Sequence, residues 1–283
     1  MPDSSVQVIG YWNKNETQSY TITNEKYKIQ NGDTIERGTC KYDVDITILD
    51  STANSYTIEW KYKNYEIKDD NELIERLSKD IKVTKAIFKT DELGSFQELV
   101  NWKEISEEIK RLISLVEQEY KNIPNMDKLF QQMTTMYSSK ESIENNAINE
   151  IQQFYSFHGG KYKIGEDIHT NIKIPSNYGG EPFDSEVEIW LDEINPDDEN
   201  YILRMTQDVD SVQLLNATYD YLSKLSSTMG TEPLKKDDLP AIKHQILTAS
   251  RIHSTGWVVY SIIDKVTESD NIRKIEKQII EIK

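Results

Sequence analysis

Four histidines and the acidic residues near them are the side chains of this sequence best suited to acid–base or metal chemistry. His158 lies close in sequence to Glu166, Asp167 and His169, and a loop could bring their imidazole and carboxylate groups together. No His-x-x-x-His, His-Glu-x-x-His or cysteine-based spacing supports a metal site here. A solvated loop is therefore the favoured interpretation, and we predict no bound metal and no cofactor.

A second group could suggest nucleophilic catalysis. His253 is followed by Ser254, and Asp264 comes later, but no Gly-x-Ser-x-Gly elbow accompanies them. Gly159-Gly160-Lys161 lacks the spacing and the hydroxyl residue of a phosphate-binding loop. We predict no catalytic residue and a protein that is not an enzyme. The acidic pairs expected to lie in solvated turns are Asp69-Asp70, Asp197-Asp198 and Asp237-Asp238.

A stripe of methionines is the best indication of a binding site. Met126, Phe130, Met133 and Met136 recur at helical spacing, and unbranched thioethers adapt to apolar ligands of varied shape. Together with Trp60 they are the candidate ligand-binding residues. Packing in an ordinary hydrophobic core is the commoner use of such a stripe, and that alternative stays open.

Charge and composition limit the classes of partner. The chain of 283 residues carries 49 acidic and 33 basic side chains, a formal charge of −16, which repels phosphate backbones and anionic membrane surfaces. We therefore expect no nucleic-acid binding. No run of about 18 apolar residues predicts a transmembrane segment. The single Cys40 excludes an intramolecular disulfide and fits a small buried thiol.

The element around which we expect the fold to be organised is an antiparallel hairpin over Tyr42–Tyr65. Apolar and polar residues alternate with period two on both sides of the turn-forming run at residues 50–55. One face of such a hairpin must be covered by another layer. Further strands are predicted at Val6–Trp12, Ser19–Ile29, Val83–Thr90, Val187–Leu191, Tyr201–Met205, Gln245–His253, Trp257–Ile263 and from Asp270 to Ile282.

Helices are predicted between and after these strands. A short one begins near Lys68, and apolar stripes of helical period cover Trp102–Val116, Met126–Tyr137 and Ile143–Tyr155, followed later by Val212–Leu225. A helix from Asp238 to Thr248 competes with the strand predicted there. The run from Trp257 to Ile263 is apolar at nearly every position, which favours a strand covered on both faces.

These elements predict an α+β fold in which a curved antiparallel sheet of hairpins and a C-terminal meander packs on amphipathic helices. We expect one domain over residues 1–283. A hairpin followed by helices occurs twice, so a weak internal duplication with halves of about 1–156 and 157–283 is proposed.

The segments Ala217–Leu222 and Thr248–Ser261 resemble an uncharacterised family of exported or lipid-anchored Bacteroidota proteins, and the layout is similar to the lipoprotein-carrier fold. The resemblance implies a periplasmic or envelope location and a role in holding an apolar ligand, and it assigns no catalytic residue. No leader and no lipid-attachment cysteine is seen near the start, so a cytoplasmic location stays open.

Two functions follow as expectations. The first is an envelope-associated binding protein that holds a lipid-like ligand between sheet and helices. The alternative is a structural or protein-interaction module without a small ligand, which predicts an exposed aromatic patch around Trp190, on the face opposite Val187 and Ile189.

Overall fold

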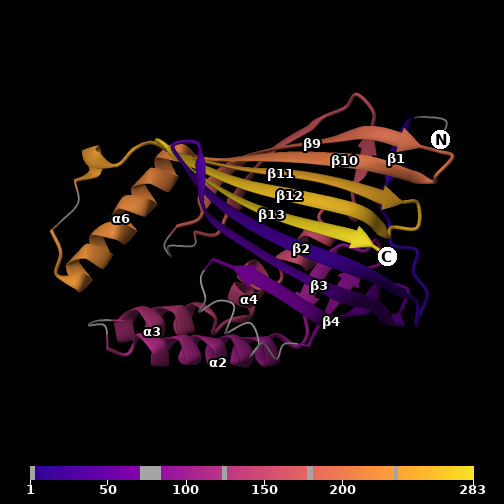
Figure 1. The fold of residues 1–283 in the computed structure, drawn as a ribbon. Helices are drawn as coiled ribbons and strands as arrows, with labels where there is room; N and C mark the ends of the chain where they lie inside the picture. Colours follow the sequence, from indigo (N-terminus) through magenta and orange to yellow (C-terminus); the bar gives the residue numbers. More distant parts are fainter. Residues whose placement is uncertain (1–3, 71–83, 123–125, 177–180, 233–234) are drawn as a thin grey trace.

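A single long antiparallel sheet dominates the computed structural model, which describes residues 4–70, 84–122, 126–176, 181–232 and 235–283. Its eleven strands follow the order β6-β5-β4-β3-β2-β13-β12-β11-β10-β9-β8 (Figure 1). The strands are β2 Thr17–Gln30, β3 Asp33–Ser51, β4 Ser55–Asp69, β5 Lys85–Asp91, β6 Phe96–Leu99, β8 Ile168–Ile174, β9 Phe183–Asn195, β10 Asn200–Val209, β11 Ile242–His253, β12 Val258–Ser269 and β13 Ile272–Ile282.

Helices pack against one part of this sheet. In Figure 1 the sheet curves so that β3 and β4 lie toward α2, α3 and α4, while α6 projects beyond the left-hand ends of the strands. The predicted α+β fold is confirmed, with the antiparallel sheet packed on helices. The helices are α2 Trp102–Tyr120, α3 Met126–Met136, α4 Lys140–Asn146, α5 Asn149–Tyr155 and α6 Ser211–Met229. Two short strands, β1 Ser5–Gln7 and β7 Lys161–Lys163, form a separate ladder.

The inner face of the sheet follows the period-two pattern of the sequence. On β3, Val44, Ile46 and Ile48 are fully buried, and the polar residues between them are partly exposed. Strand β13 pairs with β2 on one side and β12 on the other, so the C-terminal meander joins the N-terminal hairpins in the middle of the sheet. One hydrophobic core therefore draws residues from both ends of the chain.

Several expectations need correction. The strand predicted at Val6–Trp12 ends at Gln7, although Trp12 is buried. The third helical stripe is two helices, because Ile148 between them has a φ of −132° and cannot continue an α-helix. The competing helix at Asp238–Thr248 is wrong, since β11 begins at Ile242 and pairs with both β10 and β12.

Strand β12 lies inside the sheet as predicted, but it is not buried on both faces. Val258 and Ser261 are buried, whereas Val259, Tyr260 and Ile262 are half-buried. The residues of this apolar run therefore point either to a covered face or to a partly exposed face of the sheet. The helix predicted from Lys68 falls largely on residues 71–83, outside the described residues.

Helix α6 is bounded by a capping aspartate and a glycine. The Asp210 side chain accepts hydrogen bonds from the backbone N–H groups of Val212 and Gln213, at 2.9 and 2.8 Å. Gly230 ends the helix with a φ of 70°, a conformation that glycine adopts without steric cost.

Candidate functional site

The junction between α4 and α5 separates two cavities, and α5 fixes this junction to the sheet. Phe154 of α5 is 1% exposed and packs edge-on against Tyr20 of β2 and Trp60 of β4, with ring centroids 5.3 and 5.5 Å apart. Tyr155, the next residue, contacts Phe88 and Trp12. These aromatic contacts hold α5 against the inner face of the sheet.

The first cavity, called here the sheet cavity, has a volume of about 400 Å³. Strand residues of β2, β3, β4, β12 and β13 line it, together with the start of α5, and its walls mix polar and apolar groups. Its lining residues are Asn24, Glu25, Lys26, Gly38, Thr39, Cys40, Ile67, Asp69, Asn149, Glu150, Ile263, Lys265, Glu276, Lys277 and Gln278.

Glu150 is an acid of the sheet cavity whose pKa is perturbed. Burial raises the pKa of its carboxyl above the ordinary value, and the Tyr62 hydroxyl, which donates a hydrogen bond to its Oε1 at 2.8 Å, offsets part of that rise. Burial and the neighbouring Glu150 also raise the pKa of the Cys40 thiol to about 11. Cys40 is consequently a neutral thiol at physiological pH and a poor nucleophile.

An ion pair forms part of the wall of the sheet cavity. Lys26 Nζ lies 2.7 Å from Asp69 Oδ2, and the Asp69 side chain is only 7% exposed. This corrects the expectation that Asp69 and Asp70 lie together in a solvated turn, because Asp69 belongs to β4 and faces the cavity. A buried carboxylate is tolerated there because the ammonium neutralises it.

Hydrogen-bonded polar side chains, partly or fully buried, continue from this cavity across the sheet. The Gln278 amide donates to Asn24 Oδ1 at 2.6 Å, and the Gln153 amide donates to Ser261 Oγ at 2.9 Å. Ser261 and Ser250 lie 2.8 Å apart, oxygen to oxygen, on adjacent strands. Polar contacts therefore accompany the aromatic ones beneath α5 and extend toward the sheet cavity.

The second cavity, called here the helical cavity, has a volume of about 360 Å³ and lies among α2, α3 and α4. Every described side chain that lines it is apolar except for the Tyr137 hydroxyl and the Asn146 amide. The lining residues are Ile109, Leu112, Ile113, Val116, Phe130, Met133, Tyr137, Asn146 and Ala147. Such a lining suits an apolar group and offers few hydrogen bonds.

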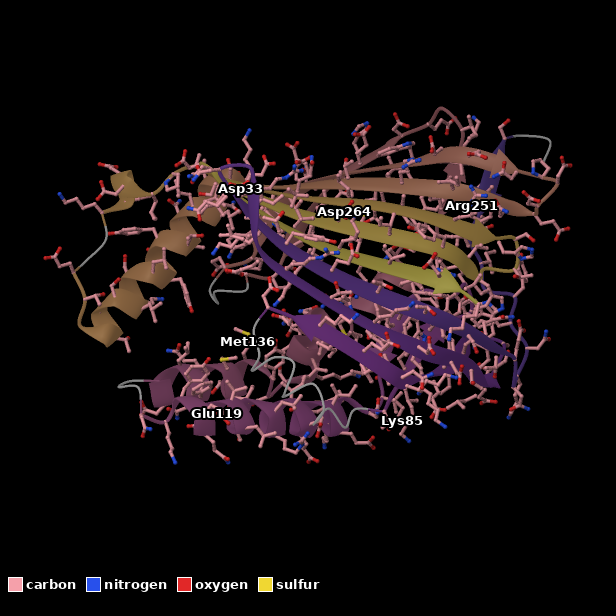
Figure 2. All side chains as sticks on the ribbon, viewed as in Figure 1. Asp33, Lys85, Glu119, Met136, Arg251 and Asp264 are labelled. Atoms are coloured by element: carbon pink, nitrogen blue, oxygen red, sulfur yellow. The ribbon has the colours of Figure 1, made fainter. Side chains whose placement is uncertain are left out.

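The structure divides the candidate ligand-binding residues between different places. Phe130, 4% exposed, and Met133, 37% exposed, both line the helical cavity. Met136 is 39% exposed and lies at the edge of the helical layer nearest the sheet (Figure 2). Trp60 does not join them, because it is fully buried in the main core. The backbone of Met126 begins α3, and its side chain lies outside the described residues.

His158 does not share a site with His169. Its ring is 7% exposed, stacks with Phe154 and places Nε2 2.8 Å from the Gly256 carbonyl oxygen. Burial lowers the pKa of this imidazole to about 4, so it is neutral at physiological pH, and Nε2 then donates to Gly256. The His169 side chain, by contrast, is 70% exposed on β8. Glu166, the third member of that predicted set, pairs with Lys163.

His253, Ser254 and Asp264 also do not converge. His253 contacts Thr255 through Nδ1 at 2.8 Å, whereas Asp264 pairs in register with Leu247, six residues back along β11. At about 3.4 Å per residue, that offset is roughly 20 Å. Gly159 and Gly160 bond their backbone to Val8 and so attach the N-terminal segment to the fold.

Sequence reasoning missed Glu150. It lies between the buried Ile148 and Ile151 in what reads as one helical stripe, so it is easily assigned to a solvated face. A carboxylate between two buried apolar residues was the available signal, and only the position of the sheet turns it toward a cavity.

Comparisons with solved structures give a distant likeness. No family model matches the chain, and no curated protein matches it. A solved structure of lipovitellin, described as concerning lipid–protein interactions, aligns with 96% of this chain at 9% sequence identity and a TM-score of 0.48. The chain spans 25% of the length of that lipovitellin chain. A TM-score below 0.5 does not establish a common fold. In the described part of the chain, we find no helix of the length and apolar character that crossing a bilayer requires.

Proposed function

We propose that this chain is a non-enzymatic, envelope-associated binding protein that holds a lipid-like ligand. The observation that carries the proposal is the helical cavity, which has a volume of about 360 Å³ and an almost wholly apolar lining. Met133 lies partly exposed in that lining, so an apolar group can reach the cavity from solvent. Burying apolar ligand surface there supplies the binding free energy.

An amphipathic ligand fits the pair of cavities better than a purely apolar one. Ala147 lines the helical cavity and Asn149 lines the sheet cavity, and two residues of chain span at most about 7 Å. We propose that a chain-like molecule crosses the α4–α5 junction, with its apolar part among the helices and its polar end near Glu150 and Gln278. The proposal differs from the expectation that the whole ligand lies between sheet and helices.

The proposal is tested by extraction and by direct binding. Native mass spectrometry of the purified protein, followed by organic extraction, is expected to release a species of lipid mass. A fluorescent fatty-acid analogue should bind the stripped protein, and Met133→Glu should weaken its binding about tenfold, because the charge must be desolvated on binding.

Met136→Glu is the matched control, since Met136 has nearly the same exposure as Met133 but does not line the helical cavity. It should bind the analogue like the wild type. Equal affinity of both variants and the wild type, or no binding of the analogue at any accessible concentration, refutes this function. Fractionation of the native cells tests the envelope location separately.

A protein-interaction module is the second candidate, and the edge strand β8 favours it. Ile168 and Ile172 on this strand are 41% and 39% exposed, and an edge strand offers unpaired backbone groups to another chain. Trp190, the residue expected to mark this surface, is half-buried rather than exposed, on the face opposite the buried Val187 and Leu191. Size-exclusion chromatography with light scattering would show self-association, and Ile172→Lys should abolish it.

A further inference from the structure

Three side chains that could bind a metal come together at the β8 edge of the sheet. One ligand atom from each of Asp167, His169 and Glu188 lies within 4.8 Å of the other two, and His169 Nε2 is 3.8 Å from Glu188 Oε1. The set considered from the sequence contained Asp167 and His169, but it included His158 and Glu166 and not Glu188. We propose that these three residues form a binding site for a divalent transition metal such as Zn²⁺.

Strand register places these donors on one face of the sheet. His169 and Glu188 are directly opposite each other in the β8–β9 ladder, and Asp167 precedes His169 by two residues. Residues two apart in an extended chain point to the same side. That side is the one away from the core, because Val187, the neighbour of Glu188 on β9, is buried.

The spacing is close to what coordination requires. Zinc bonds to nitrogen and oxygen of about 2.0–2.2 Å place neighbouring ligands of a tetrahedral site roughly 3.4 Å apart. The His169–Glu188 pair, at 3.8 Å, is already near that separation. A pair at the 4.8 Å limit exceeds it by about 1.4 Å, within the reach of a χ rotation of an exposed side chain. Because the three residues lie at the surface, water can complete the coordination shell.

Charge around the site favours a cation. Lys163 pairs with Glu166 and Lys173 pairs with Asp184, so two lysines near the site are engaged by other carboxylates. In the part of the chain that the structure describes, neither Asp167 nor Glu188 pairs with a lysine or arginine. The imidazole of His169 selects zinc, nickel or copper over magnesium and calcium, which prefer all-oxygen sites.

A bound metal would also change the behaviour of β8. Six of the seven residues of this strand are exposed, so β8 gains little stability from burial of its side chains. A metal that bridges His169 on β8 and Glu188 on β9 would tie the edge strand to the sheet. Metal binding is therefore expected to slow hydrogen exchange of the β8 backbone.

Calorimetric titration of the chelator-treated protein with zinc chloride is the direct test. We expect one saturable site in the wild type and an affinity at least about tenfold lower in His169→Ala, a loss of about 1.4 kcal/mol. Glu188→Gln should weaken binding as well, and magnesium chloride should give no binding heat. A titration in which zinc does not bind the wild type, or binds His169→Ala equally well, overturns the proposal.

His253→Ala is the matched control. His253 Nε2 lies 3.6 Å from Glu199 Oε2, a similar arrangement of imidazole and carboxylate, but no third donor of the described chain completes it. Copper quenching of Trp190 fluorescence locates the metal, because Trp190 follows Glu188 by two residues on the same face. Trp190→Phe should remove most of the quenching, and quenching that persists unchanged would place the metal elsewhere and refute the site.

Discussion

Replacing His158 should remove one component of the acid sensitivity of this protein. The folded state holds this imidazole neutral with a pKa lowered to about 4, whereas an unfolded chain restores a pKa of about 6.5. Between these two values the unfolded state binds more protons than the folded state. Stability is therefore complete above about pH 6.5 and is lost progressively as the pH falls toward 4.

The magnitude follows from the two pKa values. Lowering the pH from 7 to 4.5 should cost the wild type about 2.5 kcal/mol of unfolding free energy through this one residue. Other acids add their own dependence, so the quantity to measure is the difference between wild type and His158→Gln. Glutamine does not titrate, and its amide can still donate to the Gly256 carbonyl oxygen that accepts from His158.

Urea denaturation followed by tryptophan fluorescence at both pH values gives this difference. We expect the gap in unfolding free energy between wild type and variant to shift by about 2.5 kcal/mol in favour of the variant at the lower pH. Parallel pH profiles for the two proteins would refute the burial argument, because they would show that His158 does not titrate differently on folding.

Three further outcomes are expected. Phe154→Ala should cost about 3–5 kcal/mol in urea denaturation, since it empties a fully packed aromatic site, while Val212→Ala at a position 66% exposed should change stability by less than about 0.5 kcal/mol. Asp210→Ala should cost about 1 kcal/mol because two backbone N–H groups of α6 lose their acceptor, and a loss near zero would show that the cap is dispensable. Glu150→Gln should gain stability over wild type as the pH rises. The pKa of Glu150 is raised in the folded state, so its favourable contribution to stability is present below the unfolded pKa of about 4.3 and is lost above the folded pKa. A constant difference in unfolding free energy between the two proteins across pH 4–8 would contradict this pKa shift.

The sequence by itself determined most of the elements and the direction in which their side chains point. Period-two alternation in β3 assigns Val44, Ile46 and Ile48 to the covered face, because successive residues of a strand must point to opposite sides. Asp210 and Gly230 mark the ends of α6 through local chemistry that needs no distant partner.

Tertiary structure decided what depends on pairing between distant segments. Residues 245–248 form a strand because β10 and β12 satisfy their backbone on both sides, which outweighs a helical signal nearby. The position of the sheet places Glu150 in the wall of the sheet cavity. The β8–β9 register places His169 opposite Glu188 instead of near His158. Such positions depend on strand register and helix docking, and these are set by burial summed over the whole sheet rather than by any local run of residues.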